Sequence, residues 1–219
     1  MEKQNRDKLR IIFNNIDDKD KKLWTYAITK AFNSLPEVER SVIPDIYVYR
    51  TMIASFVDKF DIHSCQTDDV ARFMYTNGAW AYARLTDNDM FISLSIKRFE
   101  TLAEFVSPEF TIFHEFGHYQ IAKRFDEHYD EYGYEKIELK ADRYGLFALI
   151  RMLDQNMEYK TISNLEKHKS FTNTLKAMIA QNVKPDMSPD VRKETYSKIV
   201  DCIFRMHDWD NIYKNISEL

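Results

Sequence analysis

Residues 107–120 read S-P-E-F-T-I-F-H-E-F-G-H-Y-Q, a helix start followed by two histidines four positions apart. Ser107 is a favourable N-cap, Pro108 suits the first helical position, and Glu109 places an acidic side chain in the first turn. These signals predict a helix over roughly residues 108–125. Side chains four positions apart lie on the same face of such a helix. The two histidines can therefore act together.

His114 and His118 can each offer an imidazole nitrogen to one zinc ion. Glu115 is turned about 100° round the helix from His114, so it is placed to hold a water molecule rather than to bind the metal. This is the HExxH pattern, in which the glutamate is general base to a metal-activated water. A random order of a chain with 6 histidines would contain the pattern in about 1% of cases, so it seldom arises by chance.

A third ligand should follow, because a catalytic zinc commonly takes three protein ligands and keeps a fourth position for water. The best candidate is E-L-K-A-D, residues 138–142, where Glu138 and Asp142 lie one helical turn apart. Glu138 would complete the metal site, and Asp142 would hydrogen-bond the far nitrogen of a ligand histidine. Asp142 itself and His128, in the intervening segment, stay open as alternative third ligands.

The segment around this second motif has an apolar face at helical spacing. The face consists of Ile137, Ala141, Tyr144, Ala148 and Met152. Only a short connection, residues 126–134, separates it from the HExxH helix. A short connection favours antiparallel neighbours, which would bring the two motifs together.

Before the opening stretch, alternation with a period of two predicts a β-hairpin. Residues 79–85 read A-W-A-Y-A-R-L and residues 90–96 read M-F-I-S-L-S-I, on either side of the polar turn T-D-N-D. This is the only strand pair that the sequence predicts.

Elsewhere, apolar residues at helical spacing predict two or three helices before residue 61 and helices from residue 156 to the end. Three N-terminal stripes carry the first prediction: Leu9, Ile12, Phe13 and Ile16; Trp24, Ile28, Ala31 and Leu35; and Ile46, Tyr49, Ile53, Phe56, Val57 and Phe60. Ser188-Pro189-Asp190 is the start signal for a last helix.

Together, the motifs H-E-F-G-H and E-L-K-A-D resemble the signature of the gluzincin metallopeptidases, over roughly residues 70–155. With a hairpin before the HExxH helix, the chain is most similar to the ImmA/IrrE-like branch. The resemblance implies zinc (Zn²⁺) as the cofactor, hydrolysis of peptide bonds, and a sheet whose edge strand lines the cleft. The metzincin branch is excluded, because its pattern needs a glycine and a histidine where this chain has Ile121 and Arg124.

The expected fold class is α+β, mostly α, in a single domain over residues 1–219. A helical N-terminal part (1–66) would precede a zincin-like metallopeptidase core (67–155), and a helical C-terminal part (156–219) would follow it. In the core, a small antiparallel sheet, the hairpin at about 79–96, would precede the HExxH helix.

Composition narrows the function classes. A formal net charge of −4 and a pI near 5.9 give no basic field, so no direct nucleic-acid binding is expected. The two cysteines, Cys65 and Cys202, lack CxxC spacing, which excludes a thiolate zinc knuckle and a disulfide scaffold. The charged N-terminus has no signal-peptide core, and no apolar run reaches membrane-spanning length. We therefore expect a cytoplasmic protein without membrane contact.

These observations predict a zinc metallopeptidase that acts on a protein or peptide substrate. His114, His118 and Glu138 would bind the metal, and Glu115 would be the catalytic base. The alternative is a non-catalytic, metal-binding regulatory protein that keeps a zincin fold and uses its terminal helices as the working surface. An accidental motif would leave the two histidines pointing apart or packed in the core. A regulatory protein partner is compatible with the first two hypotheses, and the oligomeric state is not predicted.

A metallopeptidase also needs a donor for the oxyanion that forms at the attacked carbonyl. Four tyrosines lie near the motifs in sequence: Tyr119, Tyr132, Tyr134 and Tyr144. Spacing does not choose among them, and packing explains each one as well.

Overall fold

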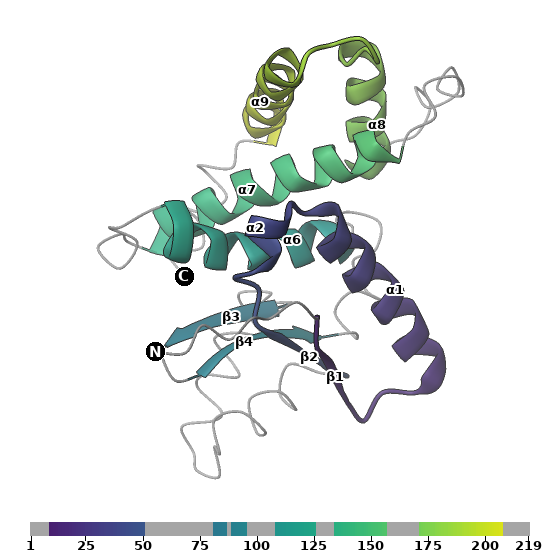
Figure 1. Ribbon diagram of the computed structural model, residues 1–219, viewed down its shortest axis with the longest axis vertical. Coiled ribbons are helices and arrows are strands. Elements are labelled where there is room, and N and C mark those ends of the chain that lie inside the picture. Colours follow the sequence, from purple (N-terminus) through teal and green to yellow (C-terminus); the bar gives the residue numbers. More distant parts are fainter. Residues whose placement is uncertain are drawn as a thin grey trace.

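The computed structural model describes residues 9–50, 81–86, 89–95, 108–125, 134–156 and 171–207. These residues are mostly helical and include one small sheet. Figure 1 shows the sheet on one side of helix α6 (Pro108–Gln120) and helix α7 (Tyr134–Gln155) on the other. None of the helices in these ranges combines the length and apolar character needed to cross a membrane.

The sheet has four strands in the spatial order β1-β2-β4-β3. Their bounds are Ile11–Asn14 for β1, Asp45–Tyr49 for β2, Ala81–Thr86 for β3 and Asp89–Ser95 for β4. The pairs β1–β2 and β2–β4 are parallel, and β3–β4 is antiparallel. Among the described strands, β3 is therefore an edge strand, and it packs against α6.

Strands β3 and β4 occupy the segment in which the sequence predicts a hairpin. Their antiparallel register runs from Ala81 opposite Leu94 to Thr86 opposite Asp89. The two residues between them, 87–88, lie outside the described residues. The sheet as a whole is mixed rather than antiparallel, because β1 and β2 extend it with parallel pairs.

The predicted helix through Leu9 and Ile16 is wrong, because β1 runs through this segment. The sequence there contains I-I-F, and β-branched and aromatic residues favour strands. A short apolar run fits both the spacing of a helix and the alternation of a strand, so spacing alone could not distinguish a helix from a strand here.

The predicted helix from Pro44 is wrong over β2 for a related reason. In D-I-Y-V-Y, Ile46 and Val48 are fully buried, whereas Tyr47 between them is half-buried. From Asp45 to Val48 this is the alternation of a strand that buries one face, and Tyr49 at its end is buried as well. The rest of the predicted stripe, residues 51–60, lies outside the described residues, as does the segment 61–80. The N-terminal part is thus not a helical extension, since it supplies two strands of the sheet.

Helix α1 (Asp18–Ser34) confirms the prediction made from its apolar spacing. Asp17 caps its start by accepting a hydrogen bond from the backbone N–H of Asp20 at 2.9 Å. Its buried residues are Trp24, Ile28, Ala31 and Phe32. The helix packs against α6 and α7, and the short helix α2 (Glu37–Arg40) follows it.

The helix predicted over residues 108–125 is confirmed as α6 and the π-helical segment η1 (Ile121–Phe125). Phe113, Phe116 and Tyr119 of α6 are fully buried, as expected of a helix enclosed between a sheet and another helix. The predicted second helix is confirmed as α7. It runs antiparallel to α6, because its successive turns meet successively earlier turns of α6.

Beyond α7, helices α8 (Phe171–Asn182) and α9 (Pro189–His207) pack on the side of α7 that faces away from the sheet (Figure 1). Ser188 caps α9 by accepting from the backbone N–H of Val191 at 3.4 Å, as its start signal predicts. Ile199, Ile203 and Phe204 turn into the core. The described C-terminal part thus consists of two helices joined by the turn at residues 183–188.

Candidate metal centre

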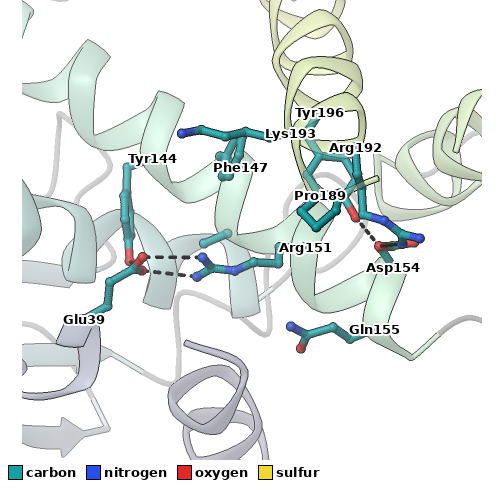
Figure 2. Close-up of a pocket in the computed structure, with 11 residues that line it drawn as sticks. Glu39, Tyr144, Phe147, Arg151, Asp154, Gln155, Pro189, Arg192, Lys193 and Tyr196 are labelled. Atoms are coloured by element: carbon teal, nitrogen blue, oxygen red, sulfur yellow. Dashed lines mark hydrogen bonds and ion pairs between the residues drawn. The ribbon is translucent and has the colours of Figure 1, made fainter. Parts of the chain in front are cut away.

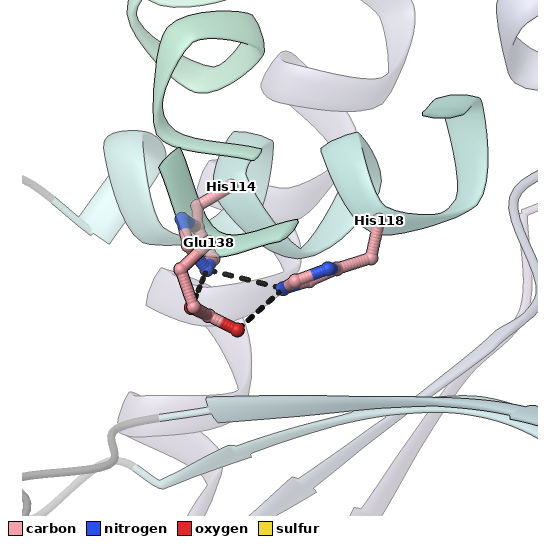
Figure 3. Close-up of side chains that lie close together, drawn as sticks. All are labelled: His114, His118 and Glu138. Carbon is pink, nitrogen blue, oxygen red and sulfur yellow. Dashed lines mark hydrogen bonds and ion pairs between the residues drawn. The ribbon is translucent and has the colours of Figure 1, made fainter. Parts of the chain in front are cut away.

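The structure brings the side chains of His114, His118 and Glu138 together at the junction of α6 and α7. Figure 3 shows them converging on the side of these helices that faces the strands. Nε2 of His114 lies 3.2 Å from Nε2 of His118 and 3.2 Å from Oε2 of Glu138. Nε2 of His118 lies 3.5 Å from Oε1 of Glu138. The two histidines therefore do not point apart, although His118 is buried at 7% exposure.

These separations fit one small metal ion. Ligand atoms about 2.0 to 2.1 Å from a tetrahedral ion lie about 3.3 Å from one another. In the structure the two Nε2 atoms are 3.2 Å apart, and they lie 3.2 and 3.5 Å from the two different carboxylate oxygens of Glu138. One ligand atom from each of the three residues lies within 4.8 Å of the other two. Two imidazole nitrogens and a carboxylate oxygen are also a donor set that zinc accepts. Spacing and chemistry thus both suit the predicted cofactor.

Asp142 lies directly behind the ring of His114. Its Oδ1 is 2.7 Å from Nδ1 of His114, and the aspartate is 3% exposed. When Nδ1–H donates to this carboxylate, Nε2 keeps its lone pair for the metal group. The structure therefore places Asp142 as a partner of His114 rather than as a third ligand. The other alternative ligand, His128, lies outside the described residues.

Glu115 is 4% exposed, and its Oε2 has no hydrogen-bond partner among the described residues. Burial raises the pKa of Glu115 to about 8. This pKa already includes the charge of His114, which lowers it, and the smaller effects of the carboxylates of Glu138 and Asp142, which raise it. A buried carboxyl oxygen without a partner is costly. Such a group, with a pKa near neutrality beside three potential metal ligands, is typical of an active site.

Two of the three side chains have the charge state that a metal ligand needs at pH 7, and the third holds an extra proton. Burial, helped by the charge of His114, lowers the pKa of His118 to about 4, so this ring is neutral at pH 7. Burial opposes ionisation of Glu138, but its hydrogen bond to His114 and the charges of both histidines leave its pKa below the usual value. Burial also opposes the charge on His114, yet Asp142 and Glu138 raise its pKa well above 6.5. A metal ion binding here would therefore displace a proton from His114.

Two of the four candidate tyrosines have described side chains. The hydroxyl of Tyr144 donates to Oε2 of Glu39 at 2.7 Å, so it is already bonded to a side chain of α2. Tyr119 is enclosed in the hydrophobic core. Tyr132 and the side chain of Tyr134 lie outside the described residues.

A separate cavity of about 680 Å³ is lined by residues of α7 and α9 and by Glu39 of α2 (Figure 2). At one end, Glu39 accepts hydrogen bonds from Tyr144 and from Nη2 of Arg151, the latter at 3.1 Å. At the other end, Asp154 pairs with Arg192 of α9. None of the HExxH residues lines this cavity, so it is distinct from the metal group.

The sequence did not lead to the contact of Glu39 with α7, or to the close approach of Gly145 to the backbone of His114. Glu39 meets Tyr144 across 105 positions of the chain, a contact that no local spacing signals. Gly145 interrupts the apolar face of α7, and an isolated glycine in a helix often marks a close approach. That signal was present in the sequence.

Comparison of the chain with models of known protein families, with curated proteins and with solved structures gives no match. Its function is therefore inferred from its own residues and their geometry.

Proposed function

We propose that this protein is a zinc-dependent metallopeptidase of the gluzincin type, similar to the ImmA/IrrE-like branch, that hydrolyses a peptide bond in a protein or peptide substrate. One observation carries the proposal. The Nε2 atoms of His114 and His118 and the two carboxylate oxygens of Glu138 converge with contacts of 3.2 to 3.5 Å, beside Glu115, a buried glutamate with an unpartnered oxygen.

His114 and His118 from α6 and Glu138 from α7 would hold the zinc ion. Bound there, zinc would polarise the scissile carbonyl and lower the pKa of a water molecule towards neutrality. Asp142 keeps the His114 ring in the tautomer and orientation that a ligand needs.

Glu115 is the proposed general base. It takes a proton from the water as the water oxygen attacks the carbonyl carbon. It then gives this proton to the amine nitrogen as the carbon–nitrogen bond breaks. A nearby cation lowers the pKa of a carboxyl group, so Glu115 would start the reaction in the ionised form that a base requires.

The edge strand β3 is the proposed binding place for the substrate. Its antiparallel pairing with β4 uses one side of the strand, and among the described strands no other pairs with it. An extended peptide can add to such an edge through backbone hydrogen bonds. Because β3 packs against α6, a peptide bound there would pass close to the HExxH helix.

The non-catalytic alternative predicts a different ligand count. A structural zinc is almost always bound by four protein ligands, whereas a catalytic zinc keeps one position for water. Within the described residues, the group offers three ligands. This count supports the catalytic proposal.

Substitution of Glu115 tests the mechanism. We expect Glu115→Gln to keep the bound metal and to lose peptide cleavage by about 10² to 10⁴-fold, because the amide cannot accept the proton. Metal content is measured by mass spectrometry of the purified chain, and cleavage with a peptide library. Glu109→Gln, on the same helix, is the control and should retain both. A wild-type protein that binds no zinc, or a fully active Glu115→Gln variant, would contradict the proposal.

A further inference from the structure

The metal group is divided between two helices. His114 and His118 project from α6, whereas Glu138 and Asp142 project from α7. The distances within the group therefore depend on how closely α7 approaches α6. Each helix carries one glycine that lies against the backbone of the other helix.

Gly145 of α7 faces the backbone of a ligand. A Cβ atom at this position would lie 3.1 Å from the backbone nitrogen of His114 and 3.2 Å from its Cα. Both distances are tighter than nine in ten real Cβ contacts. Since these neighbours are main-chain atoms inside a helix, they cannot move without moving α6.

Gly117 of α6 makes the reciprocal contact, directly before His118. Its Cβ atom would lie 3.0 Å from the carbonyl oxygen of Ala141 and 3.1 Å from the ring of Tyr144. Ala141 adjoins Asp142 in the chain. The Tyr144 ring is not free to swing away, because its hydroxyl donates to Glu39 at 2.7 Å. Here, too, the space for a methyl group must come from separating the helices.

We infer that Gly117 and Gly145 are positioning residues, which hold α6 and α7 at the separation that the metal group requires. The inference rests on the proposed metal site but does not depend on peptide cleavage. A single added methyl group would move the helices apart by a few tenths of an ångström. Metal–ligand distances tolerate only about 0.2 Å, so metal binding responds to a change that the fold can absorb.

The test is to make Gly145→Ala and Gly117→Ala separately in the full-length chain. The zinc dissociation constant is measured by competition with a chelator. In the metal-free protein, the ¹H–¹⁵N resonances of the His114 ring report its hydrogen bond to Asp142. We expect each variant to bind zinc at least about tenfold more weakly, as for other disturbances behind a ligand, and to shift the His114 resonances.

Val183→Ala is the matched control. Val183 is fully buried next to α8 and touches neither glycine, so this variant should lower the thermal midpoint while keeping the wild-type zinc affinity.

The inference is overturned if the glycine variants keep the wild-type zinc affinity and the wild-type His114 resonances. It is also overturned if Val183→Ala weakens zinc binding equally, or if both glycine variants unfold, since the glycines would then serve general packing. Zinc binding without peptide cleavage would contradict the proposed peptidase alone, whereas a wild-type protein without zinc binding would overturn both.

Discussion

Asp142 determines which nitrogen of His114 is available to the metal group. Its carboxylate can only accept hydrogen bonds, so the ring must place its proton on Nδ1 to satisfy the 2.7 Å contact. The negative charge also makes the opposite nitrogen a better donor to a cation. An asparagine would remove the charge and could present its own N–H to the ring.

We therefore expect Asp142→Asn to weaken zinc binding by about 10 to 100-fold. The dissociation constant is measured by chelator competition. Asp201→Asn is the control, because Asp201 is an exposed carboxylate that pairs with Arg143 on the surface. An unchanged affinity in Asp142→Asn would show that His114 is oriented by other contacts.

In the metal-free protein, His118 makes the free energy of unfolding depend on pH. Its pKa is 6.5 in an unfolded chain and about 4 in the folded protein, because burial disfavours its charged form. The unfolded state therefore binds the proton first, and this destabilises the fold as the pH falls from 6.5 to 4. Above pH 6.5 the residue makes no such contribution.

His118→Gln should remove this dependence. Between pH 6.5 and 4, we expect the wild type to lose up to about 3 kcal/mol of unfolding free energy relative to the variant. Urea unfolding at a series of pH values, with a chelator present, measures the difference. If the unfolding free energies of the wild type and the variant changed with pH in parallel, His118 would not be the cause of the pH dependence.

At the scale of elements, the four-residue helix α2 is hydrogen-bonded to both α6 and α7 through Glu39. The backbone carbonyl of Glu39 accepts from the side chain of Gln120 on α6 at 2.7 Å. Its carboxylate accepts from Tyr144 and Arg151 on α7. Glu39 and Arg151 form an ion pair in which both side chains are largely buried, with exposures of 12% and 21%.

Removing the charge of Glu39 should therefore destabilise the fold. We expect Glu39→Gln to lower the free energy of unfolding by about 1 to 3 kcal/mol, because Arg151 stays largely buried without a countercharge. Urea unfolding measures the change. Glu37→Gln, an exposed change on the same helix, should stay within about 0.5 kcal/mol of the wild type. Equal effects of the two substitutions would rule out the ion pair as the cause.

Elements with local signals could be predicted from the sequence. Caps and a period near 3.6 located α1, α6, α7 and the start of α9, and the HExxH spacing led to Glu138 because only a short connection separates the motifs. Strands β1 and β2 were missed, because their apolar runs are short and their parallel partners lie far away in the chain. Contacts such as that of Glu39 with Tyr144 are equally remote in sequence.

In the whole molecule, α6 packs against the sheet, α7 and α1. The sheet lies on one side, α7 on the other, and α1 packs against both helices (Figure 1). The N-terminal strands contribute no ligand, yet β2 lies next to β4 and so holds the β3–β4 pair that faces the metal group. The site thus depends on segments that supply none of its chemistry.

The division of the ligands between α6 and α7 has a consequence for folding. A metal ion held by both helices would be a reversible cross-link that closes the loop between His118 and Glu138. Like a disulfide, a cross-link of this kind restricts the unfolded chain. Unlike a disulfide, its contribution follows the free metal concentration by mass action. The attachment of α7 to the rest of the protein would then be set by the metal supply as well as by packing.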